Sequence, residues 1–449
     1  MKRPTLGLSR IFPILLVNFI GILGYSIVIP ILIFIVTDLG GNGFIYGILG
    51  AMYPLFQFMG APILGSLSDR IGRKRVLIIS QAGTFLAWLL FLLAFALPKT
   101  ELWSQQTQLT GSYVMTLPLA LIFLARIFDG FTGGNVSVAN AYLSDISTDE
   151  DRSRNFGRMG ASTSLGFVLG PAVAGILASS PWGEVVPLAL AAGISLLAIF
   201  VIGTQLRESN PCVVDTGPMK TRSFRRFFQV EHKDCYQEGN LKANPSKRGW
   251  GTVLGLPQVP LLYTIYFLTF LAFSLFYAGL PIYANGALGW TAVDLGLFLA
   301  YSSLVMIFIQ GPVLSRLSGN MPSQVLILIG AVLLALGFGL LSMDSKAIIY
   351  LANTLLSVGN GLMWPSFLAL LAGTGTPQIQ GAIQGYGNSM GSVASMLGLA
   401  LGGLLFESIG TAVFGIGAAL FVLVALLSGF HLLRRKGNRE IRPVASAPS

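Results

Sequence analysis

The chain alternates long apolar runs with short polar segments. A helix that crosses a membrane needs about 20 mainly apolar residues, and twelve runs of this kind follow one another. The predicted spans are residues 11–36, 44–67, 76–97, 117–143, 155–179, 185–205, 254–283, 291–317, 323–342, 347–372, 378–406 and 409–432. The pattern therefore predicts an all-α membrane protein with twelve transmembrane helices.

One polar stretch divides the spans into two groups of six. Two sets of residues recur across it at constant spacing: Pro62, Leu64, Leu67 and Ser68 return as Pro312, Leu314, Leu317 and Ser318, and Gly170 and Gly175 return as Gly398 and Gly403. We therefore expect two pseudo-symmetric six-helix halves with a substrate site between them. The expected segments are an N-terminal half (1–205), a cytosolic linker (206–253), a C-terminal half (254–433) and a cytosolic tail (434–449).

The composition supports a membrane protein and indicates its orientation. Hydrophobic residues make up 53% of the 449 residues and charged residues only 10%, against about 25% charged in soluble domains. With the N-terminus inside, 25 of the 28 Lys and Arg residues fall in cytoplasmic segments, as the positive-inside rule requires. We expect both termini in the cytoplasm and the chain in the plasma (inner) membrane. The net charge of +10 is then an orientation signal, and no nucleic-acid partner is expected.

A basic loop, GSLSDRIGRKRVLI, separates the second and third spans. It resembles the signature loop between the second and third helices of the major facilitator superfamily. The matching residues are Gly65, Asp69, Arg70, Gly72, Arg73, Lys74 and Arg75. The resemblance implies a cytoplasmic gate in which Asp69 ties the first half to the start of the eleventh helix, with Asp145 as a second acid. Gly65 is expected to permit close helix packing. The alternative is that the basic residues only anchor the topology.

Two charged residues, Arg126 and Asp129, lie well inside the fourth span. Charges at that depth cost at least a few kcal/mol, so they tend to be functional. Their spacing of three residues places them on one helix face, close enough to pair. The functional hypothesis is that Asp129 carries a coupling proton while Arg126 shifts its affinity; the alternative is a static ion pair. Arg126 and Gly130 also resemble the Arg-x-x-x-Gly signature of the superfamily in this helix.

The fifth span resembles the glycine and proline motif of drug:proton antiporters in the superfamily. Its matching residues are Gly166, Gly170, Pro171 and Gly175. Together with ARIFDGFTGG in the fourth span, this motif makes the first half similar to the tetracycline-efflux branch. That branch has intramembrane acids where this chain has Asn18, Ala87 and Ala331, so the resemblance does not extend to tetracycline itself.

Polar and aromatic residues inside other spans are candidates for a substrate cavity, because buried polar groups need partners or solvent. They are Tyr25, Tyr53, Gln57, Asn135, Phe276, Tyr277, Gln310, Asn360, Trp364, Gln384 and Asn388. With the many phenylalanines they predict a mainly apolar pocket for an amphiphilic organic compound.

The leading hypothesis is a monomeric secondary transporter that exports such a compound in exchange for protons. The alternative is an uptake symporter or facilitator for a metabolite. A membrane-embedded enzyme is less favoured, because the spans lack clustered nucleophiles or metal ligands, and a non-transporting receptor stays open. No cofactor, metal or direct use of ATP is expected, since no nucleotide-binding motif occurs.

Overall fold

The computed structural model describes residues 8–148, 151–210, 250–343, 345–374 and 380–440. Its first half contains α1 (Leu8–Val28), α2 (Leu32–Asp38), α3 (Gly43–Ile71), α4 (Arg73–Ala96), α5 (Leu117–Gly133), α6 (Asn135–Ile146), α7 (Arg152–Ala178) and α8 (Val185–Gln205). The second half contains α10 (Trp250–Leu254), α11 (Val259–Gly286), α12 (Ala292–Phe308), a π-helical turn (Ile309–Val313), α13 (Leu314–Asn320), α14 (Ser323–Leu340), α15 (Lys346–Ala372), α16 (Gln380–Ile409) and α17 (Ala412–Glu440). Twelve stretches among the described residues are long and apolar enough to cross a membrane, which confirms the predicted number.

Three of the predicted spans contain a break or an irregular turn. The first is interrupted between α1 and α2, around Pro30, which has no N–H to donate to the helix. The fourth is divided at Gly134, where a Cβ would lie 2.5 Å from the backbone nitrogen of Ala61 on α3. The eighth passes through the π-helical turn, which contains Pro312. Each break occurs at a proline or at a glycine packed against another helix, which a hydrophobicity pattern does not detect.

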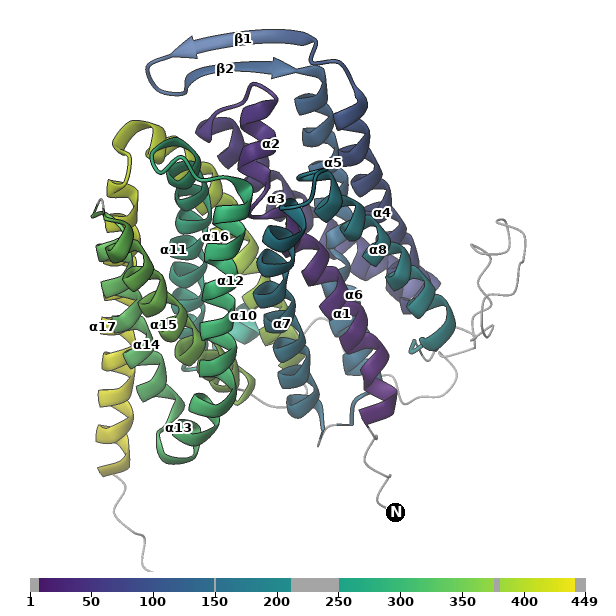
Figure 1. The fold of residues 1–449 in the computed structure, drawn as a ribbon. Coiled ribbons are helices and arrows are strands. Elements are labelled where there is room, and N and C mark those ends of the chain that lie inside the picture. Colours follow the sequence, from purple (N-terminus) through teal and green to yellow (C-terminus); the bar gives the residue numbers. More distant parts are fainter. Residues whose placement is uncertain (1–7, 149–150, 211–249, 344, 375–379, 441–449) are drawn as a thin grey trace, which may run out of the picture.

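A β-hairpin, which the apolar pattern did not predict, covers one end of the molecule (Figure 1). Strand β1 (Glu101–Thr107) pairs antiparallel with β2 (Gly111–Thr116) between α4 and α5. The hairpin is held by the turn after α2, since Val114 donates its N–H to the Gly40 carbonyl at 2.8 Å. We call this end the hairpin side. The opposite end, where α1 begins and α17 ends and where the Arg70–Arg75 loop lies, is the basic side (Figure 1).

Equivalent glycines pack in the same way in the two halves. A Cβ on Gly170 of α7 would lie 2.7 Å from Cβ of Ser26 on α1, and a Cβ on Gly398 of α16 would lie 2.6 Å from Cβ of Ser274 on α11. Close approach of this kind needs a residue without a side chain. The repeat predicted from sequence therefore corresponds to a repeated helix contact.

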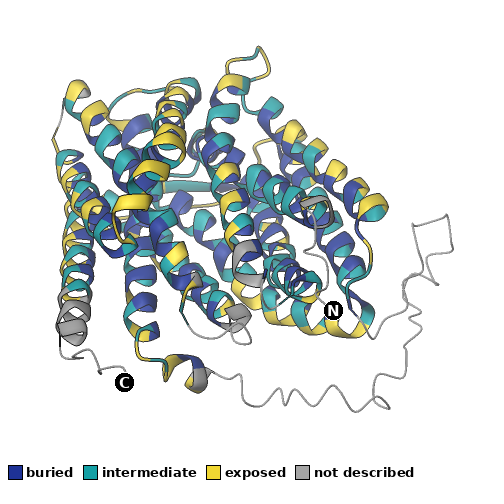
Figure 2. Ribbon diagram, turned by 90° about the horizontal axis from the view of Figure 1, so that it is seen from below, coloured by how far each residue is buried: buried dark blue, intermediate teal, exposed yellow. Residues whose placement is uncertain are grey.

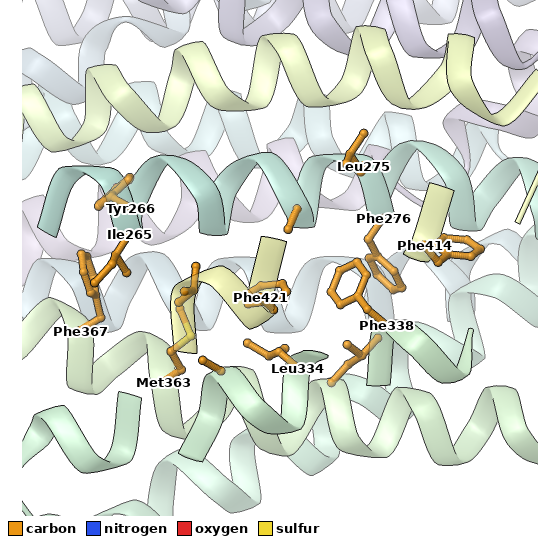
Figure 3. Close-up of a cluster of buried hydrophobic side chains, with 14 of the residues drawn as sticks. Ile265, Tyr266, Leu275, Phe276, Leu334, Phe338, Met363, Phe367, Phe414 and Phe421 are labelled. Carbon is orange, nitrogen blue, oxygen red and sulfur yellow. The ribbon is translucent and has the colours of Figure 1, made fainter. Parts of the chain in front are cut away.

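Each half has its own apolar interior. In the second half, Phe338 packs against Phe276 and Phe421 with ring centroids 5.8 and 5.2 Å apart (Figure 3). Exposed positions recur on the outward helix faces (Figure 2), and large apolar side chains such as Leu304 and Phe200 are 68% and 64% exposed. Such exposure is expected where lipid, rather than water, surrounds the helices.

Candidate functional site

The two charged residues of the fourth span form a buried ion pair. Both lie on α5, and Arg126 Nη1 is 3.4 Å from Asp129 Oδ2 while their side chains are only 3% and 4% exposed. The Arg126 guanidinium carbon also lies 5.2 Å from the ring centroid of Phe91 on α4. Its Nε is buried and has no hydrogen-bond partner among the described residues. The pair is therefore held by one long contact, and Arg126 keeps a spare donor.

Asp129 borders a small polar cavity inside the first half. The cavity has a volume of about 40 Å³, which is room for roughly three water molecules. Three of the predicted cavity residues, Tyr25, Tyr53 and Asn135, line it. Their helices, α1, α3 and α6, all belong to the first half, so this cavity is not the expected site between the halves.

This cavity is also lined by polar side chains that were not among the predicted cavity residues. They are Asn18, Gln81, Thr84, Trp88 and Ser195. Trp88 Nε1 is buried without a partner among the described residues, which leaves a donor for water in the cavity. Gln81, Thr84 and Trp88 are three and four residues apart on α4. This helical spacing of polar groups in an apolar span is the signal that could have revealed them.

Two predicted cavity residues lie where the halves meet. Gln57 donates Nε2 to Tyr53 Oη at 3.3 Å, and its Oε1 accepts a hydrogen bond from Ser392 Oγ of α16 at 3.4 Å. The Tyr277 carbonyl of α11 accepts a hydrogen bond from Tyr46 Oη of α3 at 2.8 Å. Gln57 therefore connects the lining of the Asp129 cavity to the second half.

The remaining predicted cavity residues are spread through the second half and line no common cavity with Asp129. Gln310 lies in the π-helical turn, with Nε2 buried and without a partner among the described residues. Asn360 Nδ2 is 3.8 Å from Met306 Sδ. Trp364 stacks on Phe367 with centroids 5.8 Å apart.

Three more candidates are also on helices of the second half. Asn388 Oδ1 accepts a hydrogen bond from Tyr266 Oη at 3.1 Å. Phe276 belongs to the aromatic core, and Gln384 is partly buried on α16. Asn388 and Phe276 thus contact other residues of the second half, and the cavity role of all three positions stays a prediction.

The basic loop is a single-residue connection between two helices. Gly72, with φ +103°, links the end of α3 to the start of α4. Arg73 Nη1 lies 2.6 Å from Asp69 Oδ1, and Arg73 Nε lies 3.1 Å from Asp145 Oδ2. The Asp69 side chain is 64% exposed and pairs with Arg73, within its own half. A Cβ on Gly65 would have only Ser137 Oγ nearby, at 3.6 Å, so the expected close packing at Gly65 is not observed.

The first residues after α8 bind this connection, an interaction that no sequence pattern predicted. Glu208 accepts hydrogen bonds from the backbone N–H groups of Arg73 at 2.8 Å and Lys74 at 3.2 Å, and so caps α4. Asn210 Nδ2 donates to the Asp69 carbonyl at 2.9 Å, near the end of α3. The beginning of the linker segment is thus part of the basic-side structure.

The glycine motif of α7 serves both halves. Gly166 and Gly170 pack on α1, where Ser26 Oγ donates to the Gly166 carbonyl at 2.8 Å. Gly175 packs on Gly296 of α12 in the second half. The motif also contains Pro171, which lies within α7 without dividing it.

A larger cavity, about 660 Å³, lies between α14 and α17. Its lining residues are Leu328, Val332, Ala335, Leu336, Val422, Ala425, Leu426, Gly429 and Phe430. Several of these side chains are exposed on the outer surface, Leu426 by 66%. A groove without polar groups suits lipid, whereas the Asp129 cavity is lined by ionisable and hydrogen-bonding side chains. Among the described residues, no group of His, Cys, Asp or Glu is arranged to hold a metal ion.

The twelve spans form two six-helix halves that meet along glycine contacts, and one half contains a buried ion pair. This architecture is typical of secondary transporters built from two repeated halves. The sequence profile described as "Major Facilitator Superfamily" matches residues 14–399, with a second match at 312–448. The chain belongs to this superfamily, whose members are transporters rather than enzymes.

Relatives agree with this assignment. The chain is 28% identical over 382 residues to the class C tetracycline resistance protein of Escherichia coli, covering 84% of each chain. It is 25% identical to multidrug resistance protein 2 of Bacillus subtilis, covering 91% of each. The crystal structure of the human organic anion transporter MFSD10 aligns with a TM-score of 0.65 at 20% identity, covering 94% of this chain and 99% of that one. The predicted similarity to the tetracycline-efflux branch is confirmed.

Proposed function

We propose that this transporter exports a small amphiphilic organic compound in exchange for protons, by alternating access. The observation that carries the proposal is the buried Arg126–Asp129 pair beside a polar cavity. A charged side chain inside a membrane span is costly, and the ionic contact of Asp129 that would offset this cost is long, at 3.4 Å. Asp129 would then take up a proton, and the cavity has room for the water molecules that would deliver it.

The contacts around the pair suggest how a proton could affect the second half. Protonation of Asp129 removes the charge that Arg126 faces and changes the polar cavity that Tyr53 lines. Tyr53 is bonded to Gln57, and Gln57 to Ser392 of the second half. These hydrogen bonds connect Tyr53, which shares a cavity wall with Asp129, to the interface between the halves.

The substrate class is inferred from the relatives and from three positions. The names of the relatives, tetracycline and multidrug resistance proteins, favour export of an organic compound. Where the tetracycline branch has acids, Asn18 donates to Thr163 Oγ1 at 2.9 Å and thereby connects α1 to α7, while Ala87 and Ala331 are fully buried. These positions offer no charge to a cationic substrate, so we infer an uncharged or weakly charged amphiphile.

The basic side is proposed to be cytoplasmic, with both termini there, in the plasma membrane, and the transporter is proposed to act as a monomer. On that side, the proposed gate consists of the Asp69–Arg73–Asp145 ion pairs around Gly72, together with Arg70.

The test uses inside-out vesicles with an acidic interior and a dye that reports the pH gradient. Addition of lipophilic drugs should collapse the gradient with the wild type and leave it intact with Asp129→Asn. Asp38→Asn is the matched control, because Asp38 is an exposed acid of the same half, paired with Lys99 outside the cavity. If no compound acts while labelled metabolites move down their own gradients, the protein is an uptake carrier or facilitator and the proposal fails.

A further inference from the structure

A carboxylate of the second half caps a helix of the first half on the hairpin side. Glu407, near the end of α16, accepts a hydrogen bond from the N–H of Gly43, the first residue of α3, at 2.9 Å. The first N–H groups of a helix lack partners within the helix and carry partial positive charge. A carboxylate at this position therefore stabilises the helix start and joins the two halves.

The hairpin binds the same helix start. Asn42, the residue that precedes α3, donates Nδ2 to the carbonyl oxygens of Thr110 at 2.7 Å and Ser112 at 3.2 Å. Between these two lies Gly111, with φ +69°, whose Cβ would be 2.9 Å from Asn42 Nδ2 and 3.5 Å from Glu407 Oε2. The hairpin turn, the start of α3 and the end of α16 therefore meet at one point.

The junction lies one helical turn from a tight glycine contact between these two helices. A Cβ on Gly403 of α16 would lie 2.6 Å from the Gly43 carbonyl oxygen and 2.8 Å from Gly47 Cα. Glu407 follows Gly403 by four residues and is thus on the same face of α16. The carboxylate is directed to the α3 terminus by this glycine contact.

We propose that Glu407, the start of α3 and the hairpin turn form a latch that holds the hairpin side closed. The proposal rests on the alternating-access part of the proposed function. Movement of α16 away from α3 on this side breaks the Glu407–Gly43 bond, whereas the hairpin bonds to Asn42 remain within the first half. A contact present in only one of two conformations shifts the equilibrium toward that conformation. The hairpin positions the helix start, and Glu407 supplies the bond that is lost on opening.

The test measures distances between the halves by pulsed electron paramagnetic resonance. Spin labels are attached through Trp182→Cys and Met343→Cys, which replace side chains that are 76% and 51% exposed on the hairpin side of opposite halves, in a chain carrying Cys212→Ser and Cys235→Ser. Glu407→Ala should raise the ratio of longer to shorter distances about two- to fivefold, the range of a helix-terminus charge interaction.

Two further variants make the result specific. Asn42→Ala removes the side chain that caps the start of α3 and binds it to the hairpin, so it should weaken the Glu407–Gly43 bond indirectly and shift the distances in the same direction. Lys99→Ala breaks an exposed ion pair with Asp38 that lies within the first half, and should leave the distances unchanged. The latch is refuted if Glu407→Ala matches the wild type or if Lys99→Ala shifts the distances equally. The distance measurement uses no substrate and no proton gradient. It therefore tests the latch even if the protein proves not to export a compound in exchange for protons.

Discussion

Gly175 of α7 and Gly296 of α12 are in backbone contact: a Cβ on Gly175 would lie 2.5 Å from the carbonyl carbon of Gly296. The counterpart of α7 in the second half is α16, and it makes the equivalent contact with α3 of the first half. There, a Cβ on Gly47 would lie 2.8 Å from Gly403 Cα. The halves therefore meet at two glycine seams, one on each side of the pseudo-symmetry axis. Any side chain added at a seam must push the halves apart.

We predict that Gly175→Leu reduces export about tenfold or more, since overpacking a tight contact costs about 1–3 kcal/mol and the cost falls on the conformation in which the seam is closed. The measurement is the transport rate in vesicles that contain equal amounts of protein. Gly193→Leu is the control, because Gly193 on α8 has no neighbouring atom within 4 Å of its would-be Cβ. Wild-type transport by Gly175→Leu would show that the seam does not need to close.

The ring of Phe91 is predicted to stabilise Arg126 of the ion pair through a cation–π contact. Phe91→Leu keeps an apolar side chain but removes the ring that lies 5.2 Å from the Arg126 guanidinium. Loss of a buried cation–π contact is worth about 0.5–2 kcal/mol, so we expect a roughly three- to thirtyfold loss of drug-driven proton movement. Phe95→Leu, one turn further along α4 and 38% exposed, is the control and should retain activity. Equal effects of the two substitutions would assign the loss to general packing.

The helix count, the two halves and the repeat were predictable from sequence, because each depends on patterns within one segment or between two similar segments. The same holds for Arg126 and Asp129, whose charges are conspicuous in an apolar span and whose spacing predicts pairing. The hairpin was not predicted because it lies between two spans, and a hydrophobicity pattern that identifies membrane helices does not identify strands in the polar segments between them. Pro30 and Gly134 were visible, but whether they interrupt a helix depends on neighbouring helices.

The composition of the cavity was only partly predictable for a related reason. Sequence can identify polar residues inside spans, and it found Tyr25, Tyr53 and Asn135. It cannot say which of the other candidates face the same space, since Gln310 and Trp364 are equally polar or aromatic but lie in the second half. Partnerships between distant segments, such as that of Glu208 with α4, have no sequence signature at all.

Glu208 provides a test of that missed partnership. Glu208→Ala leaves the backbone N–H groups of Arg73 and Lys74 without their acceptor, and loss of a helix cap typically costs about 1 kcal/mol. We expect lower thermal stability of the purified protein and weaker retention of the Asp69–Arg73–Asp145 ion pairs. Glu184→Ala is the matched control, because Glu184 precedes α8 but its side chain makes no capping bond. If the two variants are equally stable, the Glu208 cap does not stabilise the basic side.

The connection between α3 and α4 is predicted to tolerate only glycine at position 72. Gly72 has φ +103° and ψ +148°, a region that other residues enter at a cost of about 1–3 kcal/mol. We therefore expect Gly72→Ala to lower the thermal stability and to displace Arg73 from Asp69 and Asp145, so that export falls as well. Gly203→Ala on α8, where nothing lies within 4 Å of the added Cβ, should be as stable as the wild type or slightly more so, because alanine favours a helix. Melting curves and transport rates of the two variants, measured side by side, decide the matter. If Gly72→Ala melts and transports like Gly203→Ala, the connection can adopt another conformation and Gly72 is not the constraint that positions the basic-side ion pairs.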